Sequence, residues 1–186
     1  MSVVAVVLAA GAGSRFSGSS HKLLALVNGL PVVEHAIQAA VDSGIGDVVV
    51  VTGAVDLSSV LKKFPDLIEV HNEDWQSGQA VSIQCALHSL GAEVDRVVIG
   101  LGDQPGATPD AWRAVAADQN GITVATYSGV RGNPVGLSRD VWKMLPIDGD
   151  EGARKVMKMH PELVNELPCL GSSEDIDTEE DLRRWN

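Results

Sequence analysis

The chain has 186 residues, a formal net charge of −11 and a 45% share of hydrophobic residues, while aromatic residues make up only 4%. This length fits one domain, residues 1–186, with a core of Val, Leu, Ile and Ala. The acidic balance argues against nucleic acid and against an anionic membrane as partners, since both favour a basic protein face. An anionic small substrate therefore needs local help from Lys, Arg, backbone N–H groups or a metal ion.

We expect neither a targeting segment nor a membrane span. The N-terminus has no basic region followed by a long apolar stretch, and no apolar run approaches ~18 residues. Cys85 and Cys169 lie far apart without a C-x-x-C motif, which argues against a disulfide framework and a zinc site. The expected location is the cytoplasm, with two incidental thiols.

Short apolar runs alternate with helical patterns along most of the chain. We expect strands at residues 3–8, 47–52, 67–70, 95–101 and 122–127. We expect helices at residues 31–43, 57–64 and 79–90, and a fourth capped by Thr108 with Pro109 in its first turn. This alternation predicts an α/β fold with three α/β/α layers, a mostly parallel central sheet, and ligands bound beyond the carboxyl ends of its strands.

Apolar spacing predicts which face of two helices is buried. The first helix opens at Pro31, stops at Gly44 and should bury Val33, Ile37, Ala40 and Val41. The third helix should turn toward the sheet the side chains of Val81, Cys85, Leu87 and His88. The last third of the chain is less regular, with a helix from about Ser138 and a helix N-cap pair formed by Thr178 and Asp181.

The loop after the first strand reads L-A-A-G-A-G-S-R-F from Leu8 to Phe16. A dinucleotide fingerprint requires a third glycine where Phe16 stands, and a P-loop requires a lysine where Ser19 stands. Small residues instead let backbone N–H groups approach a base and phosphates, and Arg15 and Lys22 supply positive charge. The alternative is a glycine-rich turn with solvent-exposed cations.

Two carboxylates are candidate metal ligands. Asp103, in L-G-D-Q-P, follows the predicted central strand, where Mg²⁺ is commonly held by one or two carboxylates plus substrate phosphate oxygens. Asp177, in D-I-D-T-E-E-D-L, offers a second carboxylate. Asp103 can instead serve only a turn, and Asp177 can serve only as a helix cap, unless Thr178 takes the cap and leaves Asp177 free.

The segment N-E-D-W-Q-S-G-Q-A-V-S-I suggests a nucleotide contact at a helix start. Gly78 opens the third helix, whose first N–H groups can face an anion, and Ser82 lies one turn on. Trp75 can stack on a ring, but a half-buried core position is the favoured interpretation.

In this order, the motifs L-A-A-G-A-G-S-R with Lys22, N-E-D-W-Q-S-G-Q, G-D-Q-P, R-G-N-P-V, G-D-E-G-A-R and D-I-D-T-E-E-D-L resemble the MobA-like NTP transferases, in particular molybdenum cofactor cytidylyltransferases. The resemblance implies a Rossmann-like nucleotidyltransferase fold and Mg²⁺. It implies nucleotide contacts from Leu8, Ala9, Ala10, Gly11 and Gly13, phosphate contacts from the catalytic Arg15 and Lys22, base or ribose contacts from Gly78, Gln79 and Ser82, and metal binding by Asp103 and Asp177. It also implies that Asp103 is a catalytic residue and contacts the nucleotide. The A-A-G form of the first loop is similar to the cytidylyl branch.

The implied reaction is transfer of CMP from CTP, or of another NMP, to the phosphate of molybdopterin with release of pyrophosphate. It also implies transient contact with a molybdoenzyme or its chaperone. A phosphate nucleophile is already ionised, so none of the five histidines has to be catalytic. Two departures from the family pattern, Asn133 in G-N-P-V and Phe16-Ser17 in the first loop, concern the acceptor. Open alternatives are NMP transfer to a sugar or polyol phosphate, a nicotinamide-dependent oxidoreductase, and a binding or regulatory protein.

Overall fold

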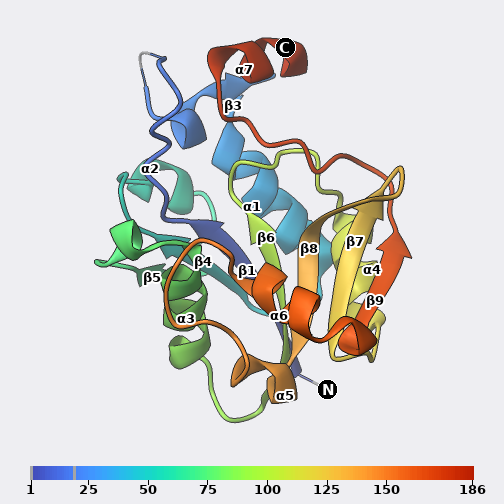
Figure 1. Cartoon of the computed structure of the whole chain (residues 1–186). Helices are drawn as coiled ribbons and strands as arrows, with labels where there is room; N and C mark the ends of the chain where they lie inside the picture. The colour runs from blue at the N-terminus through green and yellow to red at the C-terminus, as the bar shows by residue number, and fades with distance from the viewer. Residues whose placement is uncertain (1, 19) are drawn as a thin grey trace.

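A seven-stranded sheet forms the centre of the computed structural model, which describes residues 2–18 and 20–186 (Figure 1). In chain order its strands are β1 (Ser2–Ala9), β4 (Val48–Thr52), β5 (Ile68–His71), β6 (Val94–Leu101), β7 (Ile122–Tyr127), β8 (Val130–Ser138) and β9 (Val164–Pro168). The spatial order is β5-β4-β1-β6-β8-β7-β9, and of these strands β8 alone runs antiparallel to its neighbours. The predicted mostly parallel α/β sheet is confirmed.

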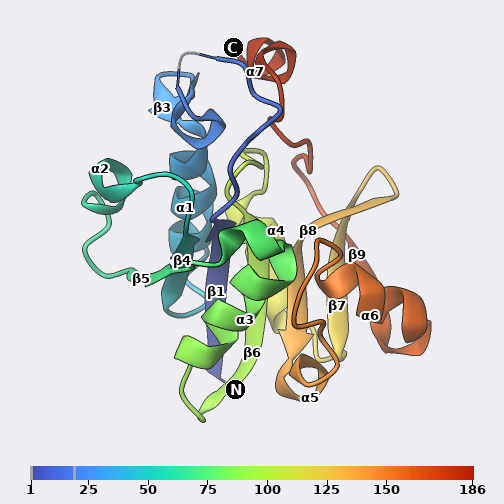
Figure 2. The same ribbon diagram turned by 60° about the vertical axis from the view of Figure 1, so that its left-hand side comes forward.

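Helices cover both faces of this sheet (Figure 2). One face carries α1 (Val32–Ser43), α2 (Ser58–Leu61) and α4 (Pro109–Ala117), and the other carries α3 (Gln79–Ser89), α5 (Arg139–Trp142) and α6 (Ala153–Met159). The hairpin β2 (Leu26–Val27) and β3 (Leu30–Pro31) and the C-terminal helix α7 (Glu179–Trp185) lie together beyond one end of the sheet. Three short 3-10 turns complete the described elements: η1 (Lys22–Leu24), η2 (Trp75–Ser77) and η3 (Pro161–Leu163).

Strand β1 shows why the sequence begins with an unbroken apolar run. Ala5, Val7 and Ala9 pack toward α1 and α4, while Val4, Val6 and Leu8 pack toward α3 and α6. A strand that alternates between two covered faces needs apolar residues at every position. Burial on both sides therefore fixes β1 at the middle of the core, from which its last residues lead into the candidate site.

The buried faces of the two long helices differ in part from expectation. In α1, Val33, Ile37 and Ala40 are buried as predicted, but Val41 is 38% exposed. In α3 the apolar residues buried most deeply are Ala80, Ile83 and Ala86. Of the four expected residues, Cys85 and Leu87 are half-buried and pack against the core, whereas Val81 is only half-buried and His88 is exposed, so the prediction is wrong for His88 and misses the deepest positions. The expected helix at 57–64 is reduced to α2, four residues long.

Two strands of the central sheet, β8 and β9, and the short hairpin β2–β3 are missing from the sequence-based expectation. Ser128 and Gly129 both have positive φ and join β7 to β8 in a two-residue hairpin. Pro134 lies within β8, opposite the register shift between Val124 and Thr126 in β7. Proline has no backbone N–H to donate to a neighbouring strand, but it is tolerated at such an irregularity. Strand β8 can therefore contain Pro134. Strand β9 is a polar edge strand, V-N-E-L-P, whose composition gives little apolar signal.

A buried arginine connects β6 to the turn before β7. Arg96 is 1% exposed, and its guanidinium donates to Thr123 Oγ1 (2.6 Å) and to the carbonyl of Asn120 (2.8 Å). Asp118 accepts from Thr123, Asn120 and Asn165. Burial raises the pKa of Asp118, but these hydrogen bonds outweigh it and lower the pKa to about 2.

Within the described residues, every helix is too short or too polar to cross a bilayer.

The Asp118 network predicts an acid-dependent loss of stability. A carboxylate whose folded pKa lies near 2 instead of 3.8 stabilises the fold above about pH 4, and this contribution is lost as the pH falls toward 2. Asp118→Asn should therefore lower the free energy of unfolding at pH 7, with a difference from wild type that narrows between pH 4 and pH 2. Urea titrations across this range measure it. The exposed Asp140→Asn is the matched control, and a pH-independent deficit would contradict the assignment.

Candidate active site

Four segments that are distant in sequence meet beyond the carboxyl ends of β1 and β6. They are the first loop, described at residues 10–18 and 20–21, the turn at 102–105, the start of α3, and the C-terminal segment at 172–178. Gly102 N–H donates to the carbonyl of Leu8 (2.9 Å), and Ile176 N–H donates to the carbonyl of Asp103 (2.9 Å). These backbone bonds fix the turn and the C-terminal segment beside the first loop, at the position where open α/β sheets bind ligands.

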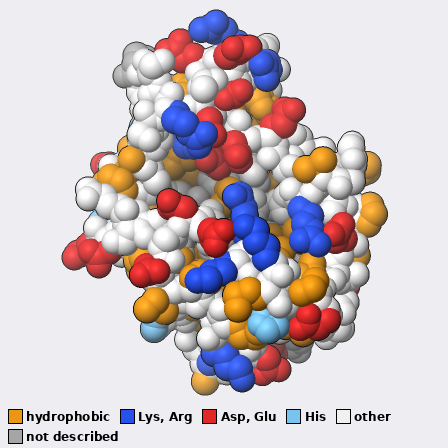
Figure 3. All heavy atoms as spheres, in the orientation of Figure 1, with side chains coloured by type: hydrophobic (Ala, Val, Ile, Leu, Met, Phe, Trp, Pro, Cys, Tyr) orange, Lys and Arg blue, Asp and Glu red, His pale blue; other side chains and the backbone are white. Residues whose placement is uncertain are grey.

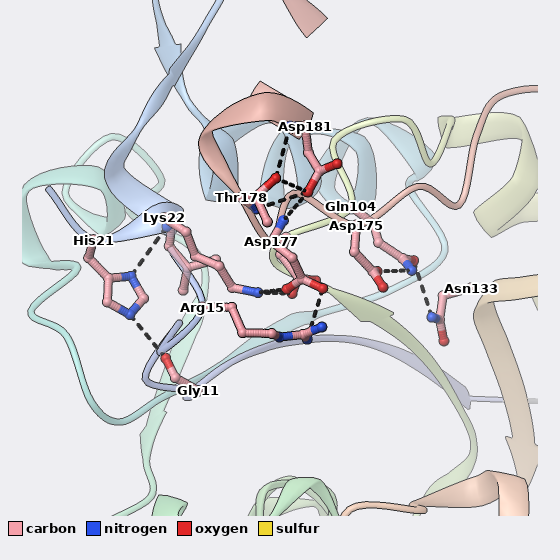
Figure 4. Close-up of polar contacts among 12 residues, drawn as sticks. Gly11, Arg15, His21, Lys22, Gln104, Asn133, Asp175, Asp177, Thr178 and Asp181 are labelled. Carbon is pink, nitrogen blue, oxygen red and sulfur yellow. Dashed lines mark hydrogen bonds and ion pairs between the residues drawn. The ribbon is translucent and has the colours of Figure 1, made fainter. Parts of the chain in front are cut away.

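The ammonium of Lys22 lies between the two predicted metal-binding carboxylates, and Figure 4 shows Lys22 and Arg15 both reaching Asp177. Its Nζ is 2.6 Å from Asp103 Oδ2 and 2.8 Å from Asp177 Oδ1, and Arg15 Nη2 is 2.8 Å from Asp177 Oδ2. The Lys22 side chain is only 10% exposed, whereas Arg15 is 75% exposed. Sequence reasoning placed these four residues at one site, but it did not anticipate that the cations would pair with the carboxylates.

The electrostatics of this cluster keep Lys22 charged. Burial lowers the pKa of its ammonium, but Asp103 and Asp177 outweigh burial and raise the pKa above its ordinary value. For Asp175, burial is the main cause of a raised pKa, and the nearby Asp103 and Asp177 add to it. The centre therefore carries two cations against a concentrated set of carboxylates.

Thr178 explains how Asp177 is available for this pairing. The Thr178 side chain accepts from Asp181 N–H, and the Asp181 carboxylate accepts from Thr178 N–H, which completes a capping box at the start of α7. The alternative in which Thr178 takes the cap is thus confirmed. The carboxylate of Asp177 is left free to face the first loop.

His21 holds the first loop in place, a role that the sequence did not reveal. Its Nδ1 accepts from Leu23 N–H (3.2 Å), and its Nε2 lies 3.1 Å from the carbonyl of Gly11 (Figure 4). Only a neutral imidazole with its proton on Nε2 satisfies both contacts. Burial lowers the pKa of His21, which favours this neutral form. No catalytic role is needed to explain the side chain.

A cavity of about 400 Å³, here called cavity A, opens over the first loop and the start of α3. Its lining includes eight of the predicted nucleotide-binding residues: Leu8, Ala10, Gly11, Arg15, Gly78, Gln79, Ser82 and Asp103. It also includes residues to which the sequence analysis gave no nucleotide role: Ala12, Gln76, Leu101, Asp150 and Arg154. Trp75, for which a core position was favoured, is half-buried against the core and lines the cavity as well.

Three predicted nucleotide-binding residues do not line cavity A. Ala9 is 2% exposed and faces the core on the α1 side of the sheet. Gly13 turns with φ +60°, and a Cβ there would lie 2.9 Å from Lys22 Cγ, so glycine lets the loop cross the lysine stem closely. Lys22 lies behind Asp103, which does line the cavity. Ala9 and Gly13 therefore contribute to the shape of the loop, and Lys22 contributes through its ion pairs with Asp103 and Asp177.

A second cavity of about 420 Å³, cavity B, lies over β6, β7 and β8. Its apolar wall comes from Ile83, Ile99, Leu101, Val124, Val135 and Met157. Its polar side is a chain of amides in which Asn133 Nδ2 donates to Gln104 Oε1 (3.1 Å) and Gln104 Nε2 donates to Asp175 Oδ1 (2.7 Å). Asn133, the residue that departs from the family pattern, is therefore part of this wall.

Cavities A and B adjoin, because Leu8, Gln79, Leu101 and Arg154 line both. Three cationic side chains line cavity B: Arg131, Arg154 and Lys158. In the space-filling view, Lys and Arg side chains gather around the hollow at the centre of this face (Figure 3). Such local positive charge allows an acidic protein to bind anions side by side.

The chain is similar to known proteins over nearly its whole length. The chain is 31% identical to nicotine blue oxidoreductase from Paenarthrobacter nicotinovorans, over 98% of this chain and 95% of that protein. The crystal structure of Rv0371c from Mycobacterium tuberculosis superposes with a TM-score of 0.84 at 27% identity, covering 99% of this chain and 96% of that one. A structure of Rv0371c in complex with manganese gives a TM-score of 0.81 at 26% identity, covering 100% of this chain and 98% of that one.

A more distant structure shows the fold alone. The inositol-1-phosphate CTP transferase from T. maritima superposes with a TM-score of 0.78 at 18% identity, covering 98% of this chain and 93% of that one. The sequence model of the MobA-like NTP transferase domain matches residues 5–164, which include the first loop, Lys22, the start of α3 and Asp103. Cavities A and B and the Lys22 cluster thus lie within a fold that solved structures share. The chain belongs to the family of nucleotidyltransferases with a MobA-like NTP transferase domain.

Proposed function

We propose that residues 1–186 form a single nucleotidyltransferase domain that transfers CMP from CTP to the phosphate of molybdopterin, releasing pyrophosphate. The observation that carries this proposal is that cavities A and B adjoin, with Asp103 of the Asp103–Asp177 pair lining cavity A. A nucleotide in cavity A and a phosphorylated acceptor in cavity B would meet at this boundary. The product would then pass to a molybdoenzyme or its chaperone.

The chemistry requires the protein to hold two anions together. An oxygen of the acceptor phosphate attacks the α-phosphorus of CTP, and pyrophosphate leaves with the electron pair of the broken bond. The attacking phosphate is already ionised at neutral pH, so no general base is needed. The rate enhancement comes from orientation and from cationic groups near the developing charge, here Arg15 and Lys22.

The residues present fit a magnesium ion. Both Asp103 Oδ2 and Asp177 Oδ1 lie within 2.8 Å of one atom, Lys22 Nζ, so they are close enough together to share a cation. Among residues 2–18 and 20–186, no three acidic, His or Cys side chains gather into a complete protein-only metal site. Two carboxylates completed by phosphate oxygens are the usual arrangement for Mg²⁺, which would neutralise the triphosphate. The manganese complex of Rv0371c supports a divalent ion at this fold.

Cavity B favours a heterocyclic acceptor over a sugar phosphate. Its apolar wall offers a surface for a planar ring, and the amides of Asn133 and Gln104 with the Asp175 carboxylate offer hydrogen bonds to the ring edge. Arg131, Arg154 and Lys158 supply charge for a phosphate tail. A sugar or polyol phosphate would leave much of the apolar wall unused.

A second candidate function is a nicotinamide-dependent oxidoreductase, which the name of the 31% identical relative favours. Against it, Phe16 stands where a dinucleotide fingerprint has its third glycine, and its ring packs near Ile176 instead of leaving room for a closely packed helix. The next experiment separates the two candidates.

Ligand-dependent thermal stabilisation tests the proposed function. A ligand at about a hundred times its dissociation constant should raise the melting temperature by roughly 5–10 °C. We expect CTP with Mg²⁺ to do so, GTP, ATP and UTP to do so less, and EDTA to abolish the shift. Stabilisation by NADH or NADPH alone, without any nucleoside triphosphate effect, would favour the oxidoreductase.

Asp103→Ala tests the catalytic carboxylate. This variant should retain a native circular dichroism spectrum, because Asp103 follows β6 and contributes little to the core. Without the Asp103 carboxylate, the protein loses a ligand of the divalent ion that would stand at the reacting phosphates. The rate of pyrophosphate release should therefore fall by about a hundredfold or more. The exposed Asp66→Asn is the control for a surface carboxylate change. An Asp103→Ala enzyme with wild-type turnover would remove Asp103 from the mechanism.

Lys22→Gln tests whether the carboxylate pair can take a metal ion. Loss of the ammonium leaves two largely buried carboxylates without their partner and should cost about 2–3 kcal/mol of stability. Millimolar Mg²⁺ should restore much of the melting temperature, since the ion can take the place of the ammonium. Lys63→Gln, which breaks the 2.7 Å pair with Glu34 on α1, should show no Mg²⁺-dependent recovery. Equal responses of the two variants to Mg²⁺ would exclude a metal site at Asp103 and Asp177.

A further inference from the structure

The motif G-D-E-G-A-R, residues 149–154, docks onto the start of α3. Ala80 N–H donates to the carbonyl of Gly149 (2.9 Å), and Gly149 N–H donates to the carbonyl of Ser77 (3.0 Å). At Gly78, which has φ +102°, a Cβ would overlap the backbone of Gly149. At Gly152, with φ +49°, a Cβ would lie 2.8 Å from Gln79 Oε1. The contact is therefore close and depends on glycine on both sides.

This docking places Arg154 at the boundary of the two cavities. Arg154 is the second residue of α6, and it lines both cavity A and cavity B. The other three residues that line both cavities are uncharged: Leu8, Leu101 and Gln79. Arg154 is thus the one charged residue in the set that lines both cavities.

Arg154 also differs from the other cations of the site in its partners. Arg15 and Lys22 pair with Asp177, Arg131 pairs with Glu166 (2.7 Å), and Lys158 pairs with Glu151 (3.0 Å). In the part of the chain that the structure describes, Arg154 forms no ion pair. Its planar guanidinium therefore keeps its donors available for incoming oxyanions.

We propose that Arg154 is a catalytic residue that contacts both substrates at once, the α-phosphate of the nucleotide in cavity A and the phosphate of the acceptor in cavity B. This inference rests on the proposed function. In the transfer step, an acceptor oxygen forms a bond to the α-phosphorus, and the bond from that phosphorus to the oxygen leading to the β-phosphate breaks. Arg154 gives up no proton; its fixed charge offsets the repulsion between the two phosphates and the charge that develops between them.

Steady-state kinetics of Arg154→Gln test the proposal, with CTP, Mg²⁺ and molybdopterin as substrates and pyrophosphate release as the signal. We expect kcat to fall about a hundredfold and KM to rise for both substrates. Arg154→Lys should recover only part of this loss, because an ammonium cannot hold two phosphates with a planar fork. Lys155→Gln, one residue further along α6, removes the same charge from an exposed side chain and should behave as wild type.

Arg131→Gln distinguishes a residue that serves both cavities from one that serves cavity B alone. Arg131 lines only cavity B, so its loss should raise KM for molybdopterin and leave KM for CTP unchanged. The proposal is overturned if Arg154→Gln keeps kcat within twofold of wild type, or if it changes KM for one substrate only.

Equilibrium binding separates failure of this inference from failure of the proposed function. If wild-type protein releases no pyrophosphate from any nucleoside triphosphate with molybdopterin, the proposed function is wrong. Calorimetric titrations of wild type and Arg154→Gln with Mg²⁺–CTP, and with inorganic phosphate, then judge Arg154 directly. Weaker binding of both probes to the variant supports a double contact, and unchanged binding of either probe overturns it.

Discussion

The site depends on one ammonium group held between two carboxylates. Lys22 comes from the first loop, Asp103 from the turn after β6, and Asp177 from the segment before α7, so a single side chain joins three distant parts of the chain. At 10% exposure this group is largely removed from water, and charge-assisted hydrogen bonds of 2.6 and 2.8 Å offset the desolvation. The C-terminal segment, which forms no long element of its own, is positioned by this contact and by the hydrogen bond from Ile176 to Asp103.

The sheet topology explains why two cavities lie side by side. The parallel strands β1 and β6 end at the same edge, and there the first loop and the Asp103 turn form one wall of cavity A. The antiparallel β8 then inserts between β6 and β7, so that Asn133 and Val135 face the same opening from the other direction. The reversed strand β8 thus places cavity B next to cavity A. Cavity B has an apolar wall and cationic side chains at its rim.

Much of this arrangement could be predicted from the sequence, and the rest depends on contacts between distant residues. Short apolar runs identify β1, β4 and β6, since strands covered on both faces need apolar residues at nearly every position. The motifs gathered Arg15, Lys22, Asp103 and Asp177 at one site. No local pattern identifies β9, a polar edge strand, and none reveals that Lys22 pairs with both carboxylates. The position of Arg154 depends on the docking of residues 149–154 onto the start of α3. The apolar spacing within α6 does not predict this contact between distant segments.

The glycine contact between Gly78 and the turn at residues 149–152 has a consequence for how this protein can change over evolutionary time. A Cβ on Gly78 would overlap the backbone of Gly149, and a Cβ on Gly152 would press on the side chain of Gln79. A substitution in one turn therefore displaces the other, and with it the wall shared by the two cavities. The two turns are separated by some 70 residues of sequence. We expect them to be inherited as a pair, so that a lineage which replaces one glycine also rebuilds the opposing turn.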